Sequence, residues 1–241
     1  MTLSVSQLSL AGRLDNLTLE FHPGEVTAIC GPNGAGKSSL LTCLAGLAGE
    51  GVALGGAALS AMPPRERARA IGYLPQSAEV AWDVSVETLV GLGRLPWQSG
   101  AVQDARHVAD ALAAMELKAL RNRPVSQLSG GERARALVAR VLAGTPRWLL
   151  ADEPLANLDL AHQLALLASL RALAGQGLGV VLVLHDLAHA MNHADRVIVL
   201  DGGRLVRDGR PEVALDEATI AKVWGVSARW LGEPGQRALV V

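Results

Sequence analysis

Hydrophobic residues along this chain follow two different periods. In residues 17–21, leucine and phenylalanine alternate with polar residues, which is typical of a half-buried strand. Three later runs are almost continuously apolar, as in strands buried on both faces of a parallel sheet: residues 147–151, 179–184 and 196–200. Between the first two of these runs, residues 161–175 have the period of a helix. Strands that alternate with helices predict an α/β core.

The middle of the chain has a different pattern. Residues 77–145 contain two segments of helical period, 104–117 and 131–144, and no convincing buried strand. We therefore expect one domain over residues 1–241, with an α/β core of about 1–76 and 146–241 and an inserted helical subdomain of about 77–145. Near the end, Asp-Gly-Gly separates two apolar segments within residues 196–209, which predicts a hairpin.

Composition and charge exclude some functions. The formal net charge of the 241 residues is −1, so bulk electrostatics give no reason to expect a nucleic-acid partner. Cys30 and Cys43 lie in an apolar strand and in the helix after it, where a small buried hydrophobe is expected rather than a disulfide or a metal ligand. The chain begins without the pattern of an export signal and has no apolar run of about 18 residues or more. Any membrane association is therefore expected to depend on a partner.

A glycine-rich loop follows the apolar run that ends at Cys30. The segment "GPNGAGKS" fits the pattern G-x-x-x-x-G-K-S in its required strand, loop and helix context, the Walker A motif. Its backbone amides are expected to point at phosphates, Lys37 to reach the β- and γ-phosphates, and Ser38 to ligate Mg²⁺. The alternative is a glycine-rich turn with an incidental lysine. The expected ATP-binding residues are Gly31, Pro32, Asn33, Gly34, Ala35, Gly36, Lys37, Ser38 and Ser39.

Two carboxylates follow a second buried strand. Asp152 and Glu153 in "RWLLADEP" are expected at the carboxyl edge of the sheet, where open α/β sheets bind ligands. Asp152 would hold Mg²⁺ through its water shell, and Glu153 would polarise the attacking water. Alone, such a pair often only begins a solvated loop. Together with a Walker A motif, it favours nucleotide hydrolysis.

A capped helix start supplies another candidate phosphate contact. In "LSGGE", Ser129 and Glu132 have the spacing of a capping box before an apolar helical period. Gly130 and Gly131 leave the helix start without side chains, so its amides could approach a phosphate. The alternative is a well-capped helix and nothing more. The Walker motifs favour the phosphate interpretation.

With these segments in place, the chain resembles the ATP-binding subunits of ABC transporters over nearly its whole length. The motifs are "GPNGAGKS", "YLPQ" with Gln76, "LSGGE", "LLADEP", "LANLD" with Asp159 and "VLHD" with His185, in the family's order. The resemblance implies a P-loop NTPase core with an antiparallel β portion and a helical subdomain. It also implies a head-to-tail homodimer in which the signature residues Ser129, Gly130, Gly131 and Glu132 act on ATP bound to the partner subunit.

The resemblance also assigns roles to Gln76 and His185. His185 leaves a buried strand at the same sheet edge as Asp152 and Glu153, where it could contact the γ-phosphate and orient the water. The alternative is a histidine at a strand end, as His189 and His193 are expected to be solvated or packed. Gln76 could be a loop residue, but the family pattern makes it a ligand of Mg²⁺ and water. The implied catalytic residues are Glu153, His185, Gln76 and Lys37, and the implied Mg²⁺ ligands are Ser38, Gln76 and Asp152.

Two alternatives to a transporter remain. A small-molecule kinase would leave "LSGGE" and His185 unexplained, and a soluble non-transport ABC ATPase is expected to carry long coiled coils or a second cassette. "RARAIGYLPQ" leading to "VETLVGLGRLPW" is similar to importer ATPases for metal chelates, namely iron-siderophore, haem and cobalamin. That similarity implies two transmembrane permease subunits, a periplasmic binding protein and a peripheral position on the cytoplasmic face of the inner membrane. Trp82 and Trp97 would then be permease contacts or packed residues.

The expected adenine contact departs from the family. Many ABC ATPases stack adenine on an aromatic residue before Walker A, but the only aromatic residue before Gly31 is Phe21, whose alternation points it into the core. The segment "SLAGRLDN" offers Leu10 and Arg13 instead. Adenine would be contacted by apolar packing or by a guanidinium lying flat against the ring.

Overall fold

The computed structural model describes residues 1–77, 83–97 and 99–241. A central six-stranded sheet has the order β10-β9-β3-β8-β7-β6. The pairs that join β9, β3, β8, β7 and β6 are parallel, and β10 pairs with β9 antiparallel. The strands are β3 (Val26–Cys30), β6 (Ile71–Leu74), β7 (Trp148–Asp152), β8 (Gly179–Val183), β9 (Arg196–Asp201) and β10 (Arg204–Gly209). Three of them, β3, β7 and β8, are buried along their whole length.

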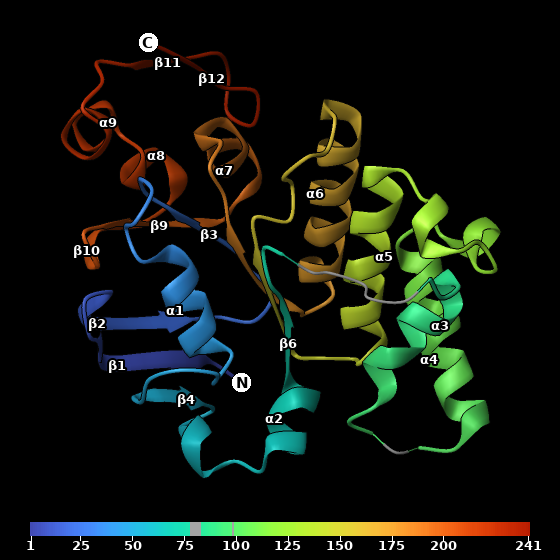
Figure 1. The fold of residues 1–241 in the computed structure, drawn as a ribbon. Helices are drawn as coiled ribbons and strands as arrows, with labels where there is room; N and C mark the ends of the chain where they lie inside the picture. The colour runs from blue at the N-terminus through green and yellow to red at the C-terminus, as the bar shows by residue number, and fades with distance from the viewer. Residues whose placement is uncertain (78–82, 98) are drawn as a thin grey trace.

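A second, antiparallel sheet packs beside the central one, with α1 (Lys37–Leu44) between the two (Figure 1). Its order is β2-β1-β4-β5, from β1 (Leu3–Leu10), β2 (Leu14–Phe21), β4 (Val52–Leu54) and β5 (Ala57–Ala58). One apolar cluster joins both sheets and α1, and it includes Phe21, whose side chain is fully buried. The expectation that Phe21 points into the core is confirmed.

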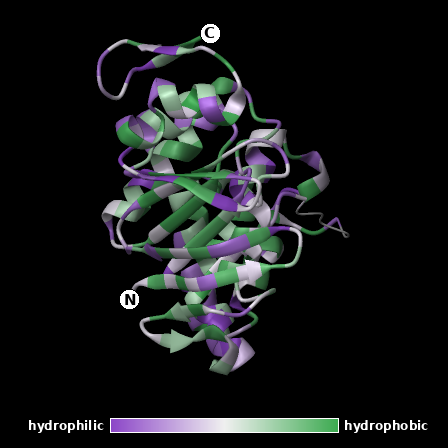
Figure 2. Ribbon diagram, turned by 90° about the vertical axis from the view of Figure 1, so that its left-hand side faces the viewer, coloured by the Kyte–Doolittle hydropathy of each residue, from purple (hydrophilic) through white to green (hydrophobic). Residues whose placement is uncertain are grey.

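Helices cover the other face and one side of the central sheet. The helices α6 (Leu160–Gly175) and α7 (Leu187–His193) contribute to a second apolar cluster with the strands. In Figure 1, α3 (Val86–Gly91), α4 (Ala101–Ala114) and α5 (Gly130–Ala143) form a group to one side of the sheet. Figure 2 shows hydrophobic residues along the central strands and mixed colours on the outer helices, as their partial burial requires.

Shorter elements complete the described chain. A helix α2 (Pro64–Ala70) runs directly into β6. After the β9–β10 hairpin come α8 (Pro211–Ala214), α9 (Glu217–Trp224) and a two-stranded sheet of β11 (Arg229–Leu231) and β12 (Ala238–Val240). The 3-10 helices are Leu59–Ala61, Leu92–Arg94, Lys118–Leu120 and Val125–Gln127.

The predicted fold class is confirmed, with shifts in particular elements. The three apolar runs are β7, β8 and β9, and the predicted hairpin is formed by β9 and β10. The helix expected over 104–117 is α4, which begins and ends three residues earlier. Cys30 and Cys43 are buried free thiols, as expected, and burial raises the pKa of the Cys30 thiol to about 12. The boundaries of the helical subdomain stay a prediction.

Candidate active site

The glycine-rich loop curls around the side chain of Lys37. The loop joins the end of β3 to the start of α1, and Lys37 is only 5% exposed. Its Nζ donates hydrogen bonds to the carbonyl oxygens of Gly31, at 2.8 Å, and of Pro32, at 2.9 Å. Burial lowers the pKa of Lys37, while the Glu153 carboxylate acts in the opposite direction. The loop therefore holds the Lys37 ammonium group at the N-terminal end of α1.

Gly36 is required both by conformation and by space. It caps α1 with a φ of 96°, in the left-handed region that favours glycine, and no side chain caps the helix. A Cβ atom at Gly36 would lie 2.7 Å from the Arg13 carbonyl oxygen and 2.8 Å from Leu14 Cδ2. The first amides of α1 consequently remain without side-chain partners, which is the arrangement that binds phosphate.

Asp152 is a buried carboxylate beside a hydroxyl. It is the last residue of β7, is 4% exposed and lies close to the Ser38 hydroxyl. Burial raises the pKa of Asp152, and its Oδ1 has no hydrogen-bond partner among the described residues. One carboxylate, one hydroxyl and substrate phosphates form an oxygen set that suits Mg²⁺. Within the described chain, no cluster of three or more His, Cys, Asp or Glu offers a site for a more strongly chelated metal.

Both carboxylate oxygens of Glu153 contact neighbouring side chains. Oε2 accepts a hydrogen bond from Gln76 Nε2 at 2.7 Å, and Oε1 lies 2.5 Å from His185 Nε2. Its φ of 51° is unusual for a residue with a side chain and turns the chain sharply at the end of β7. Because Gln76 uses its amide nitrogen here, its carbonyl oxygen, the atom that could ligate Mg²⁺, does not contact Glu153.

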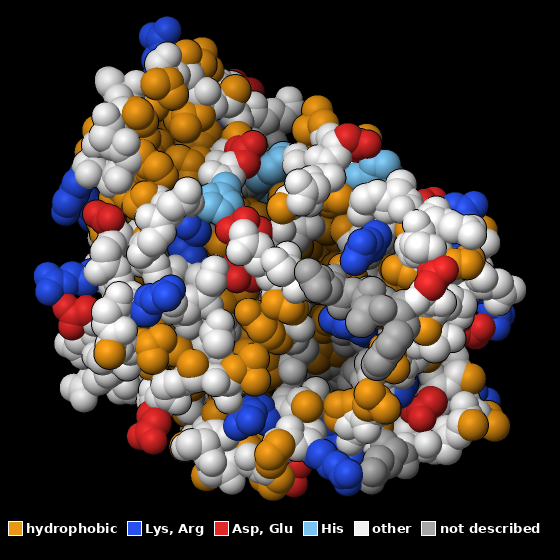
Figure 3. All heavy atoms as spheres, in the orientation of Figure 1, with side chains coloured by type: hydrophobic (Ala, Val, Ile, Leu, Met, Phe, Trp, Pro, Cys, Tyr) orange, Lys and Arg blue, Asp and Glu red, His pale blue; other side chains and the backbone are white. Residues whose placement is uncertain are grey.

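The loop residues, Gln76, Glu153 and His185 open into one cavity of about 510 Å³, whereas Asp152 lines a second cavity beside it. On the face drawn in Figure 3, histidine side chains lie beside acidic and basic ones near the middle of the molecule. The sequence-predicted loop, Gln76, Glu153 and His185 are thus brought together. The residues that line the cavity are Arg13, Asn33, Gly34, Ala35, Gly36, Lys37, Ser38, Ser39, Gln76, Glu153 and His185.

The signature segment does not line the Lys37 cavity. Ser129 caps α5, and its hydroxyl and backbone exchange hydrogen bonds with Glu132, which confirms the predicted capping box. The backbone N–H of Ser129 lowers the pKa of Glu132. Gly130 lines a second cavity, also of about 510 Å³, onto which Gln76 and Glu153 open. Among the described residues that line the Lys37 cavity, none belongs to the signature segment or is Asp159.

A contact that the sequence analysis missed joins the signature to Asp159. Asp159 caps α6, and its Oδ1 accepts from the backbone N–H of His162 at 2.9 Å and lies 2.7 Å from His162 Nδ1. The first of these bonds is the main reason that the pKa of Asp159 is lowered. A Cβ atom at Gly131 would lie 2.4 Å from the His162 ring. Within the chain, glycine at position 131 is therefore required by His162. The Asp-x-x-His spacing was the available signal.

We expect Gly131→Ala to lower the free energy of unfolding by about 1–3 kcal/mol, because the added methyl group overpacks against the His162 ring. In a His162→Ala background the same change should cost much less, since the ring is gone. Denaturant unfolding of the four variants of this cycle measures the coupling. Gly175→Ala, at a position with no atom within 4 Å of the added carbon, is the control. Equal costs of Gly131→Ala in both backgrounds would contradict the packing explanation.

The residues predicted to contact adenine or a permease, and His189, lie in different places. Arg13 is exposed and lines the Lys37 cavity, whereas Leu10 packs against the apolar cluster between the sheets. Trp97 is half-buried, and its indole N–H donates to the Gly144 carbonyl oxygen at 2.8 Å. Trp82 lies outside the described residues. His189 is buried, and its Nε2 lies 2.9 Å from Gln163 Oε1, which agrees with a packed residue.

The chain is similar to proteins of a known family. A model of the ABC transporter family matches residues 14–156. The hemin import ATP-binding protein HmuV of Streptomyces coelicolor is 43% identical over 242 residues, which covers 98% of this chain and 86% of that protein.

Two solved structures resemble the chain over most of its length. One is an inward-facing transporter assigned to the metal-chelate ABC type, with a TM-score of 0.83 and 25% identity over 99% of this chain and 95% of that one. The other is the ATP-binding cassette MJ0796 as a post-hydrolysis dimer with ADP and phosphate. It has a TM-score of 0.75 and 26% identity over 88% of this chain and 99% of that one.

Proposed function

Because the chain belongs to the ABC transporter family of ATP-binding proteins and is an ATPase of that type, we propose that it drives import of a metal chelate, with haem as the favoured cargo. It would do so as a homodimer bound to two permease subunits that receive the cargo from a periplasmic binding protein. Its place would be peripheral, on the cytoplasmic face of the inner membrane. Among the described residues, no helix combines the length and apolar character needed to cross a bilayer.

The observation that carries the ATPase chemistry is the contact of Glu153 with Gln76 and His185 in the cavity of Lys37. We assign Lys37 and the amides of α1 to the phosphates, and Glu153 to the water that attacks the γ-phosphate. His185 would orient this water and contact the developing charge. Ser38, Asp152 and Gln76 would hold Mg²⁺, which neutralises phosphate charge when bound.

The position of the signature segment supports the proposed dimer. The described lining of the Lys37 cavity contains no residue of that segment. We infer that a second copy brings Ser129 and Gly131 to the ATP bound in this cavity. The cassette MJ0796, which the chain resembles over 88% of its length, forms a dimer with ADP and phosphate. We infer that Asp159, joined to the signature through His162, reaches the partner in the same arrangement.

The cargo proposal rests on the relatives, because no residue of this chain is expected to touch the chelate. It can be tested by purifying the chain from membranes with its associated proteins and reconstituting the complex in vesicles. We expect the haem-loaded binding protein to stimulate ATP hydrolysis more than the same protein loaded with cobalamin or a ferric siderophore. Recovery without membrane proteins would contradict the transporter proposal, and preference for another chelate would contradict haem alone.

The absence of an aromatic residue at the expected adenine contact gives a separate prediction. Stacking of a base on an aromatic ring is worth about 1–3 kcal/mol in single-stranded nucleic-acid proteins, and this chain has no aromatic residue at the expected place. We expect GTP to compete with ATP within roughly tenfold, a difference of about 1.4 kcal/mol. Equilibrium competition on the Glu153→Gln variant measures this ratio. A preference for ATP of about a hundredfold or more would show that another group reads the base.

A further inference from the structure

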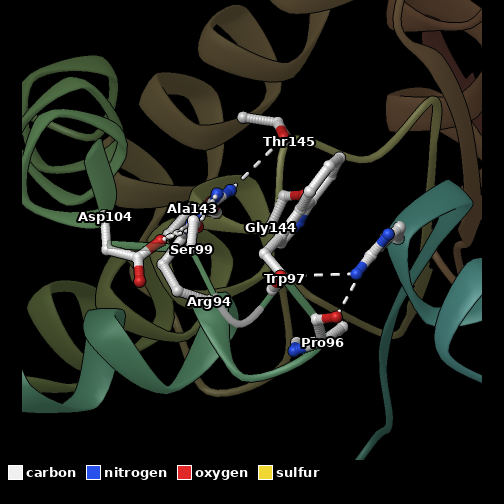
Figure 4. Close-up of polar contacts among 9 residues, drawn as sticks. Arg94, Pro96, Trp97, Ser99, Asp104, Ala143, Gly144 and Thr145 are labelled. Atoms are coloured by element: carbon white, nitrogen blue, oxygen red, sulfur yellow. Dashed lines mark hydrogen bonds and ion pairs between the residues drawn. The ribbon is translucent and has the colours of Figure 1, made fainter. Parts of the chain in front are cut away.

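The signature helix α5 is held at its far end by two side chains. Arg94 Nη1 donates to the Ala143 carbonyl oxygen at 2.9 Å, and Trp97 Nε1 donates to the Gly144 carbonyl oxygen at 2.8 Å (Figure 4). The last carbonyl groups of a helix have no donor within the helix, and a cation near them is favourable. Arg94 and Trp97 together therefore anchor the C-terminal end of α5, whose N-terminal end is Ser129.

Arg94 has little freedom to move. It is 5% exposed, its Nε donates to Asp104 Oδ1 at 2.8 Å, and its Nη2 donates to Ser99 Oγ at 3.1 Å. Hydrogen bonds from Ser99 and from Arg94 lower the pKa of Asp104. Hydrogen bonds to several neighbours thus hold the guanidinium of Arg94 and fix the orientation of Nη1, which donates to α5.

Trp97 also connects this end of α5 to the sheet. Two guanidinium groups lie over its ring, with the Cζ of Arg69 and the Cζ of Arg94 each 4.9 Å from the ring centroid. Arg69 also donates to the carbonyl oxygens of Pro96, at 3.0 Å, and of Trp97, at 3.3 Å. Since Arg69 belongs to α2, which runs directly into β6, the stack joins α5 to the strand that precedes Gln76.

We propose that Arg69, Trp97 and Arg94 position the signature helix, so that Trp97 acts more on ATP held by the partner subunit than on ATP in its own chain. The proposal rests on the proposed function, because it needs Ser129 to complete the partner's site. The 14 residues of α5 span about 21 Å. A rigid helix can carry a shift at one end to the other. A misplacement of about 1 Å at a reacting site can cost up to about 100-fold in rate.

The variant Trp97→Leu removes the ring and the N–H donor but keeps an apolar side chain. We expect kcat for ATP to fall about tenfold, with a KM changed by less than about twofold because the phosphate loop is intact. A merely destabilising substitution would instead lower the active fraction and the thermal midpoint. Arg106→Gln, on an exposed arginine of α4, is the control for changes in the helical subdomain.

Heterodimers purified through a different tag on each subunit decide which site is affected. Trp97→Leu in one subunit and Lys37→Ala in the other leaves one intact composite site, and we expect about half of the parental ATPase activity. Both substitutions in one subunit, paired with an unsubstituted subunit, damage both sites. The activity of this heterodimer should be at least about fivefold lower than that of the first. The reverse order, or equal activities, would overturn the proposal.

Two further heterodimer experiments distinguish failure of this proposal from failure of the proposed function or of folding. Ser129→Arg in place of Trp97→Leu tests the composite site itself, so its failure would count against the proposed function and not against Trp97 alone. If Trp97→Leu does not fold, Arg69→Gln weakens the same stack from the side of α2. We expect it to give the same order of activities with a loss of about threefold. Equal activities for Arg69→Gln in the two arrangements would overturn the proposal.

Discussion

Glu153→Gln should lower kcat for ATP hydrolysis by at least about 100-fold while ATP still binds, because the amide cannot act as a base for the attacking water. The substitution keeps the size of the side chain, and the amide oxygen can still accept the hydrogen bond from Gln76. Binding through Lys37 and the loop amides does not depend on Glu153 basicity. We expect the variant to accumulate as an ATP-bound dimer.

Phosphate release and equilibrium ATP binding measure the two effects separately. Glu50→Gln, at an exposed carboxylate outside the cavity, is the matched control and should behave like the parent. If Glu153→Gln hydrolyses ATP at close to the parental rate, Glu153 is not the base, and the contact with His185 has another purpose.

The second large effect is recovery of activity when two inactive variants are mixed. Lys37→Ala removes the buried cation of the phosphate loop, and Ser129→Arg removes the cap of α5 and fills its bare start with a long side chain. A heterodimer of the two carries both defects in one composite site and neither in the other. If one intact site suffices, random mixing should restore about a quarter of the parental ATPase activity.

The control replaces Ser129→Arg by Ser126→Arg, which adds the same charge at an exposed position three residues earlier. This variant should retain activity before mixing. Mixtures of Lys37→Ala and Ser129→Arg that stay as inactive as either variant alone, with mixed dimers present, would show that each subunit completes its own site.

The core strands and the phosphate loop could be predicted because each is identified by a pattern within a short stretch of sequence. Continuous apolar runs identify β7, β8 and β9, and the spacing of Gly31, Gly36 and Lys37 identifies the loop. The start of α4 could not be placed, because Gly100 caps it without a side-chain hydrogen bond and gives no signal. Met115 and Leu117 extended the expected helix, yet they are buried after α4 has ended.

The contacts of the candidate site depend on strand order, which the sequence does not state. Gln76, Glu153 and His185 follow β6, β7 and β8, and these strands are neighbours in the sheet. Their common edge was predicted for Glu153 and His185, but the hydrogen bonds between the three side chains follow only from this order. In the same way, the sequence shows Gly131 but not the His162 ring that excludes a side chain there.

We propose that two copies of this chain bind ATP between the phosphate loop of one and the signature segment of the other. The most direct test is sedimentation equilibrium of the Glu153→Gln variant with and without saturating Mg²⁺-ATP, with Ser129→Arg added in a parallel sample. We expect a dimer with ATP, a monomer without it, and loss of the ATP-dependent dimer when Ser129 is replaced. A Glu153→Gln variant that binds ATP but remains a monomer at saturation would contradict this proposal.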